Sequence, residues 1–169
     1  MLSESLTDVR SQVLHLLSNG VYVLTACVGD TMHAAAVSWA SQVSIEPPLI
    51  MIALKRHSHL VGAVRRAHRF ALNILGADQQ ELAEKFLVHF AVPASDQSLA
   101  GYLYRSSSAH CALLTDAMAW VECRVAGEAP TPGDHALILG EVTSAGVRRS
   151  SPPMVLWNTS WSYGGLRAD

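Results

Sequence analysis

The chain has 169 residues, of which half are apolar and 15% are charged, and its formal net charge at pH 7 is −2. A chain of this length can bury a sizeable core, so we expect residues 1–169 to form a single domain. The slightly negative charge argues against a nucleic acid-binding protein, which normally presents a concentrated positive face. No apolar run approaches the ~20 residues of a membrane-spanning helix, so we expect no membrane association.

The cysteines and the first residues indicate a cellular compartment. Cys27, Cys111 and Cys123 are odd in number and show no Cys-x-x-Cys spacing, which is more typical of reduced thiols than of a disulfide framework. Ser3 and Glu4 precede any apolar periodicity, unlike the apolar segment of a secretory signal. We therefore expect a cytoplasmic protein. Its high apolar content also suggests that a partner subunit covers part of its surface.

The chain begins with an expected helix and a β-hairpin. Residues 4–19 place leucine and valine at helical spacing. Residues 20–28 are rich in β-branched and aromatic residues, Gly29-Asp30 forms a turn, and the chain returns over residues 32–37. This pattern predicts an antiparallel pair of strands.

Two further strands follow, separated by Pro47-Pro48. Residues 34–41 are mostly small, an unusual strand composition that suits a flat ligand lying close to the backbone; the alternative is a strand packed beneath a helix. The prolines cannot donate to a ladder, so we expect a sharp turn there. Residues 49–54 are an unbroken apolar run and predict a buried strand.

The buried strand ends in the sequence Lys55-Arg56-His57-Ser58-His59, which opens an expected helix reaching about His68. The free amides and positive dipole end of a helix N-terminus, together with cationic and hydroxyl side chains, suit a phosphate group. The alternative is a solvated basic loop. We expect no metal here, because His57 and His59 would point to opposite sides of a strand without further ligands nearby.

The middle of the chain predicts another core strand over residues 70–75 and a short helix capped by Asp78, with Glu81 completing a capping box. Residues 91–115 lose periodicity and gain serines. Segments of this kind often form loops over a site.

Residues 119–126 and 136–147 predict a long antiparallel pair. After this pair the chain carries a dense aromatic group, which needs a surface to cover. Its members are Trp157, Trp161 and Tyr163.

These segments, in this order, resemble the flavin reductase-like, FMN-binding split-barrel family. The similarity begins with the small-residue strand, the Ser-x-Glu-Pro-Pro-Leu motif at Ser44–Leu49, the apolar strand and the basic-Ser turn. It continues through Arg69–Leu75, Glu81–Phe86, Trp120–Val125 and Gly133–Val142. The resemblance implies a mainly β fold with flanking helices, an antiparallel, Greek-key-like split β-barrel that forms a homodimer.

The resemblance also implies a site. FMN, or alternatively FAD, would bind to Val37, Ser38, Trp39, Ala40, Ser41, Ala53, Leu54, Lys55, His57, Ser58, His59, Phe86, Trp161 and Tyr163. Lys55 and Ser58 would hold the phosphate, and His135 would contact the nicotinamide substrate. Core packing of Phe86, a dimer role for Trp161 and Tyr163, and a turn role for Asp134-His135 remain alternatives.

The implied activity is NAD(P)H:flavin oxidoreductase, with NADH or NADPH as reductant and a partner monooxygenase or other acceptor for the reduced flavin. The cofactor carries the electrons, so we assign no catalytic acid or base. The Trp-x-x-Gln-Val-Ser motif at Trp39–Ser44 is closer to family members whose FMN is a fixed prosthetic group. An FMN electron carrier without NAD(P)H activity is therefore the alternative, and a barrel that has lost its cofactor is a third possibility.

Overall fold

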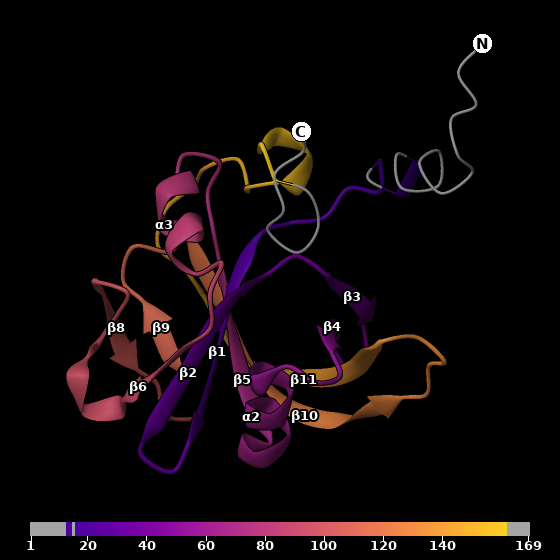
Figure 1. The fold of residues 1–169 in the computed structure, drawn as a ribbon, viewed down its shortest axis with the longest axis horizontal. Coiled ribbons are helices and arrows are strands. Elements are labelled where there is room, and N and C mark those ends of the chain that lie inside the picture. The colour runs from indigo at the N-terminus through magenta and orange to yellow at the C-terminus, as the bar shows by residue number, and fades with distance from the viewer. Residues whose placement is uncertain (1–12, 15, 162–169) are drawn as a thin grey trace.

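The computed structural model describes residues 13, 14 and 16–161, which form a curved antiparallel sheet with flanking helices (Figure 1). Eight strands are paired in the order β3-β4-β11-β10-β5-β1-β2-β6. In chain order they are β1 (Tyr22–Val28), β2 (Thr31–Val37), β3 (Ala40–Ser44), β4 (Leu49–Lys55), β5 (Arg69–Ile74), β6 (Phe90–Pro93), β10 (Ala119–Ala129) and β11 (His135–Val147). The mainly β, antiparallel fold expected from the sequence is confirmed.

The expected hairpin is also confirmed, since β1 and β2 pair from Tyr22↔Val37 to Val28↔Thr31. Gly29 in its turn has a φ of 57°, a left-handed conformation that glycine adopts without steric cost.

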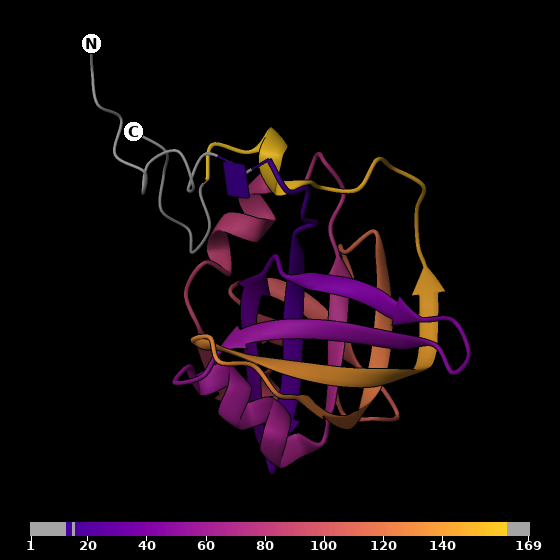
Figure 2. The same ribbon diagram turned by 90° about the vertical axis from the view of Figure 1, so that its right-hand side faces the viewer.

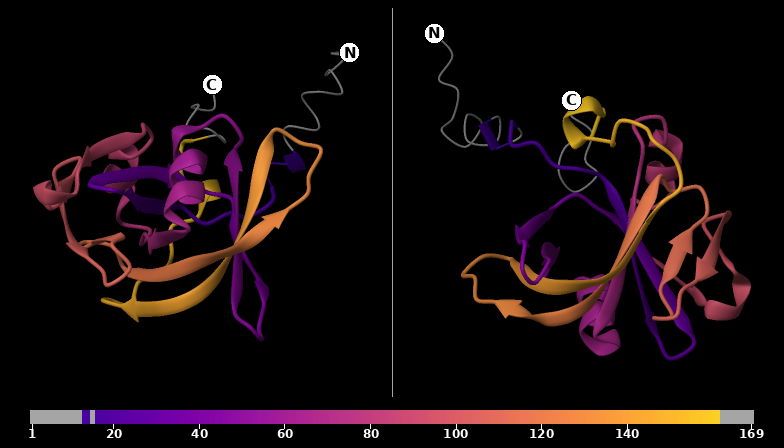
Figure 3. Two further views of the ribbon diagram at one scale, coloured as in Figure 1. Left: turned by 90° about the horizontal axis from the view of Figure 1, so that it is seen from below. Right: turned by 180° about the vertical axis from the view of Figure 1, so that it is seen from behind.

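The sheet folds over on itself, so that β3, β4 and β11 cross in front of β1, β2 and β5 (Figure 2). The long pair β10 and β11 connects the two halves (Figure 3). Its register shifts twice, between Glu122 and Cys123 and between Val125 and Gly127, and such bulges bend strands. Among the described strands, no ladder joins the sheet ends β3 and β6.

The core between the halves combines side chains from both. Leu24 of β1, Ile52 of β4, Phe70 of β5 and Ile138 of β11 are fully buried in one cluster. Gly140 of β11 is required by close packing there, because an added Cβ would lie 2.5 Å from the Phe70 Cζ atom. Burial of these apolar side chains is the main force that holds the folded sheet together.

Helix α2 (His59–Ala67) covers one end of the sheet and buries Leu60, Val61, Ala63 and Val64. Helix α3 (Gln80–Lys85) buries Leu82 and Ala83. The capping box predicted at its start is wrong: the N-cap is Gln79, without a side-chain cap, and Asp78 instead accepts a 2.8 Å hydrogen bond from Arg149.

The loop predicted over residues 91–115 is likewise wrong, because most of it is ordered secondary structure. After β6 come a 3-10 turn, η1 (Ala94–Asp96), and a small sheet of β7 (Ser98–Leu99), β8 (Tyr102–Ser106) and β9 (Ala112–Leu114). Leu99, Tyr104 and Leu114 are buried in a second core cluster. This segment is therefore part of the core, and none of its residues lines the cavity described below.

The last described segment contains the 3-10 turn η2 (Leu156–Asn158) and is tied to the start of β1 by a hydrogen bond from the Val21 amide to the Met154 carbonyl. Most of the helix expected over residues 4–19 lies outside the described residues. Within the described part of the chain, no helix is long and apolar enough to cross a membrane.

Candidate functional site

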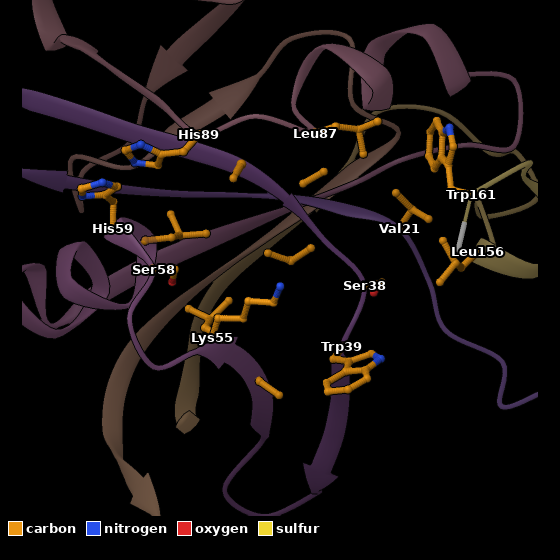
Figure 4. A pocket seen from close by; sticks show the side chains of 16 residues that line it. Val21, Ser38, Trp39, Lys55, Ser58, His59, Leu87, His89, Leu156 and Trp161 are labelled. Atoms are coloured by element: carbon orange, nitrogen blue, oxygen red, sulfur yellow. The ribbon is translucent and has the colours of Figure 1, made fainter. Parts of the chain in front are cut away.

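A cavity of about 280 Å³ lies where the end of β2, the end of β4 and the start of α2 meet (Figure 4). The loop before β6 and the last described segment complete its wall. Ser58, His59 and His89 lie toward one end of this wall, and Leu156 and Trp161 toward the other (Figure 4). The cavity thus joins segments that are far apart in the sequence.

Nine of the fourteen residues expected to bind the cofactor line this cavity. They are Val37, Ser38, Trp39, Ala53, Leu54, Lys55, Ser58, His59 and Trp161. Their placement follows from the topology, because the chain runs from the end of β2 into β3, whose first residue, Ala40, pairs with Ile52 near the end of β4.

Four expected residues lie outside the cavity wall. Ala40 and Ser41 belong to the β3–β4 ladder, opposite Ile52 and Met51. Phe86 is fully buried in the second core cluster. His57 is exposed in the turn between β4 and α2. The fifth, Tyr163, lies outside the described residues.

The basic-Ser turn contributes Lys55 and Ser58 to the cavity wall, and the Lys55 ammonium points toward the middle of the cavity (Figure 4). Ser58 is the N-cap of α2, and its hydroxyl oxygen accepts a 3.2 Å hydrogen bond from the Val61 amide. The hydroxyl hydrogen remains able to donate to a ligand. Lys55 lines the same cavity, and the first turn of α2 contains no acidic residue. The positive helix end, the hydroxyl and the ammonium group together suit a phosphate.

Arg56, the remaining cation of this turn, has a different task. Its Nε donates a 2.8 Å hydrogen bond to the Gly133 carbonyl, and its Nη2 donates one of 2.6 Å to the Thr131 carbonyl. Arg56 therefore fixes the turn between β10 and β11 against the end of β4.

Part of the cavity wall is formed by small apolar residues. Ala35 and Ala36 of β2 and Ala53 of β4 contribute only methyl groups, which leaves the strand backbones accessible to a flat ligand. The Trp39 carbonyl accepts a 2.9 Å hydrogen bond from the Ala53 amide, which holds the Trp39 backbone against β4. An aromatic side chain beside a small-residue wall fits a planar ring system.

His135 does not line the cavity itself but contacts a residue that does. Its ring centroid lies 4.7 Å from that of Trp39, at an interplanar angle of 45°. The Nδ1 atom of His135 is 2.6 Å from a carboxylate oxygen of Asp134, and this hydrogen bond holds the pKa of Asp134 below its usual value. The His135 side chain is 8% exposed. His135 is thus placed to orient the Trp39 indole.

Seven lining residues were not among those expected from the sequence. They are Val21, Ala35, Ala36, Leu60, Leu87, His89 and Leu156. The two alanines belong to the small-residue strand, so that pattern could have identified them. Leu87 and His89 reach the cavity through a tertiary contact, since the Ala36 amide donates a 2.7 Å hydrogen bond to the Phe86 carbonyl; no local pattern signals it.

The three cysteines lie outside the cavity wall. Burial, together with the nearby Glu122, raises the pKa of Cys111 and of Cys123 to about 12, and Cys27 is half-buried. Within residues 13, 14 and 16–161, no group of three or more His, Cys, Asp or Glu side chains is arranged to hold a metal ion.

Comparison with known proteins gives a consistent assignment. The family model for the flavin reductase like domain matches residues 14–165. The chain is 34% identical over 146 residues to an NADPH-flavin oxidoreductase of Streptomyces viridifaciens, covering 84% of this chain and 73% of that protein. It is 35% identical over 138 residues to the NADH-dependent FMN reductase AsuE2 of Streptomyces nodosus subsp. asukaensis, covering 80% of this chain and 72% of that protein.

Two other similarities concern the fold and the length. The crystal structure of BorF, the flavin reductase component of a bacterial two-component tryptophan halogenase, matches with a TM-score of 0.78 at 23% identity, covering 98% of this chain and all of that one. Diflavin flavoprotein A 1 of Synechocystis sp. is 29% identical over 87% of this chain, which spans only 25% of that longer protein. The family match over 14–165 and the 34% and 35% identity to two reductases of similar extent lead to one conclusion: this chain belongs to the flavin reductase-like family.

Proposed function

We propose that this protein is an NAD(P)H:flavin oxidoreductase that binds FMN in the cavity and supplies reduced flavin to a partner oxygenase. The observation that carries the proposal is the cavity itself, whose wall combines Lys55 and the helix-capping Ser58 with small residues of β2 and with Trp39. Relatives named as NADPH- and NADH-dependent flavin reductases support it, as does the structural likeness to a reductase component of a two-component halogenase.

The residues of the cavity fit the chemical groups of FMN. Ser58 and Lys55 would bind the phosphate by charge-assisted hydrogen bonds, the strongest class of protein hydrogen bond. Ala35, Ala36 and Trp39 would position the ring and shield it from water. When bound, the flavin supplies the hydride-accepting centre, so the protein has to provide position and orientation more than acid or base groups.

We also infer a homodimer in which the sheet forms the split barrel of the family. Strand β3 is at the edge of the described sheet and is exposed, and the adjoining Ile45 is 84% exposed. Exposed apolar side chains on an edge strand are typical of an interface. The cavity volume, about 280 Å³, is at the low end for small-molecule sites, which fits a ligand covered partly by a second subunit. Sedimentation should give a dimer, and Ile45→Asp should shift it toward monomer.

The three free cysteines fit a reducing compartment, so we propose the cytoplasm as the location. The relatives are named for NADPH in one case and for NADH and FMN in the other. We therefore propose FMN as the flavin, with FAD as an alternative, and either nicotinamide nucleotide as reductant.

Steady-state turnover tests the function. With catalytic amounts of protein and excess free FMN, a flavin reductase should oxidise many equivalents of NADH or NADPH, and the rate should rise and saturate with FMN concentration. If FMN binds but neither nucleotide is oxidised, the reductase proposal is refuted.

A second candidate function is an FMN electron carrier reduced by a protein partner. The specific observation in its favour is Trp39, which lines the cavity and whose ring packs against His135; a bulky indole beside the flavin would narrow the access of a nicotinamide. The similarity to part of a diflavin flavoprotein is compatible with it. Trp39→Ala separates the two candidates, because the smaller side chain should increase NADH oxidation by a carrier whose access is blocked.

A further inference from the structure

Three histidines extend the anion-binding end of the cavity; we refer to His33, His89 and His59 together as the histidine column. His89 lies in the middle, with its ring centroid 5.3 Å from that of His33 and 5.3 Å from that of His59, and both pairs are nearly parallel. His59 and His89 line the cavity beside Ser58 (Figure 4). His33, on β2, is behind them and is half-buried. The column brings together β2, α2 and the loop before β6.

His33 and His89 are disfavoured as protonated, positively charged imidazoles unless a negative charge lies nearby. The His33 Nδ1 and His89 Nε2 atoms are 3.1 Å apart, so one of these nitrogens must carry a hydrogen and the other must be bare. Burial lowers the pKa of His33, and His89, Arg66 and His59 lower it further; burial and His59 lower the pKa of His89.

Within the described residues, the charged and titratable groups that shift the pKa of His33 or His89 are all basic. They are His59 and Arg66 from α2 and His89 from the loop before β6, and Lys55 from β4 lines the same cavity. No carboxylate is among the groups that shift the pKa of His33 or His89. The negative charge of an anion that enters this end of the cavity would therefore stabilise the positively charged forms of these basic side chains.

We propose that the histidine column binds a phosphate monoester and takes up a proton when the phosphate enters, so that it selects ligands ending in a phosphate dianion. The proposal rests on the proposed function, since the column adjoins the Ser58 and Lys55 site assigned to FMN. Two ligands of this protein carry such a group: FMN at its ribityl end, and NADPH at its ribose 2′ position. His59 and His89 share the cavity with Ser58 and Lys55, which favours FMN.

The proposal has a defined pH signature. A dianion next to His33 and His89 favours their protonated imidazoles, so the pKa of these two histidines in the complex exceeds its value in the free protein, where burial lowers it. Affinity therefore has its full value below the pKa of the free protein and falls as the pH rises from there through the pKa of the complex, by at most about tenfold per pH unit for one proton. The phosphate of FMN loses its own second proton near about pH 6. Measurements above about pH 7 therefore report the histidines alone.

The experiment is calorimetric titration of FMN in two buffers of different protonation enthalpy, at about pH 7 and about pH 8.5, with riboflavin as the ligand that lacks phosphate. The wild-type protein should take up a substantial fraction of one proton with FMN and none with riboflavin, and its FMN affinity should fall at least about threefold over this interval. His89→Gln and His33→Gln should each abolish both effects, with folding checked by circular dichroism.

The matched control is His110→Asn, which removes an exposed histidine from a left-handed turn position (φ 59°) that asparagine tolerates. This variant should behave as wild type. Measurable proton uptake that is equal for FMN and riboflavin, or uptake that persists in both His89→Gln and His33→Gln, overturns the proposal.

A parallel titration with NADPH and NADH identifies the source of the phosphate. Proton uptake with NADPH alone, lost in His89→Gln, supports the column as a phosphate site and moves it to the nicotinamide nucleotide. FMN binding with no pH dependence in either titration overturns this inference and leaves the proposed function intact. Failure of any flavin to bind overturns both.

Discussion

Ser58 combines two tasks that substitution can separate, one in folding and one in binding. Its hydroxyl caps α2 by accepting a hydrogen bond from the Val61 amide, and the same hydroxyl lines the cavity. Ser58→Ala removes both the hydrogen bond that caps α2 and the hydroxyl group in the cavity wall. Loss of an N-cap costs about 1 kcal/mol of unfolding free energy, within a range of about 0.5–2 kcal/mol.

The effect of Ser58→Ala on binding follows from the charge of the ligand. A hydrogen bond to a charged group contributes about 1.5–3 kcal/mol, so FMN affinity should fall by about 10- to 150-fold if that bond is fully lost. Riboflavin affinity should change little, because riboflavin has no phosphate.

Ser58→Asp separates the two tasks. Aspartate is as good an N-cap as serine, so the unfolding free energy of the apoprotein should stay within about 0.5 kcal/mol of wild type. The added carboxylate would face the phosphate, so FMN should bind more weakly than to Ser58→Ala. Urea unfolding and flavin fluorescence titration measure the two quantities. Wild-type FMN affinity in Ser58→Asp would refute the placement of the phosphate, and unchanged stability in Ser58→Ala would refute the cap.

Three further outcomes are expected. Lys55→Ala should weaken FMN binding by about 1.5–3 kcal/mol, the contribution of a charged hydrogen bond, and unchanged affinity in a fluorescence titration would exclude that role. Gly140→Ala should lower the unfolding free energy by about 1–3 kcal/mol, because its Cβ would lie 2.5 Å from an aromatic carbon. Gly127→Ala, with no atom within 4 Å of the added Cβ, is the control, and equal urea midpoints for the two variants would contradict the packing. Cys111 and Cys123, with a pKa of about 12, should react with a thiol reagent at about pH 8 only after unfolding; rapid modification of either in the folded protein would contradict their burial.

The sequence predicted those parts of the site that depend on local order. The turn from Lys55 to Ser58 follows a strand and begins a helix, and each of these elements has its own pattern in the chain. Both residues therefore line the cavity, as expected from the strand-turn-helix arrangement. The strands β1, β2, β4, β5, β10 and β11 were predicted for the same reason, because alternating or continuous apolar runs mark them directly.

The parts of the fold and the site that the sequence did not predict depend on contacts between segments far apart in the chain. Asp78 and Glu81 have the spacing of a capping box, but Arg149, 71 positions beyond Asp78, pairs with Asp78 instead. The strands β7, β8 and β9 have only two, five and three residues, too few to show a period. His89 reaches His33 across 56 positions of the chain, so the histidine column has no local signature.

The proposed function requires that the cavity hold a flavin that nicotinamide nucleotides reduce. The most direct test is the visible spectrum of the FMN-loaded protein before and after anaerobic addition of NADH or NADPH. A flavin reductase should lose the absorption band of oxidised flavin near ~450 nm. A protein that binds FMN and keeps this band unchanged with both nucleotides would contradict the proposed function.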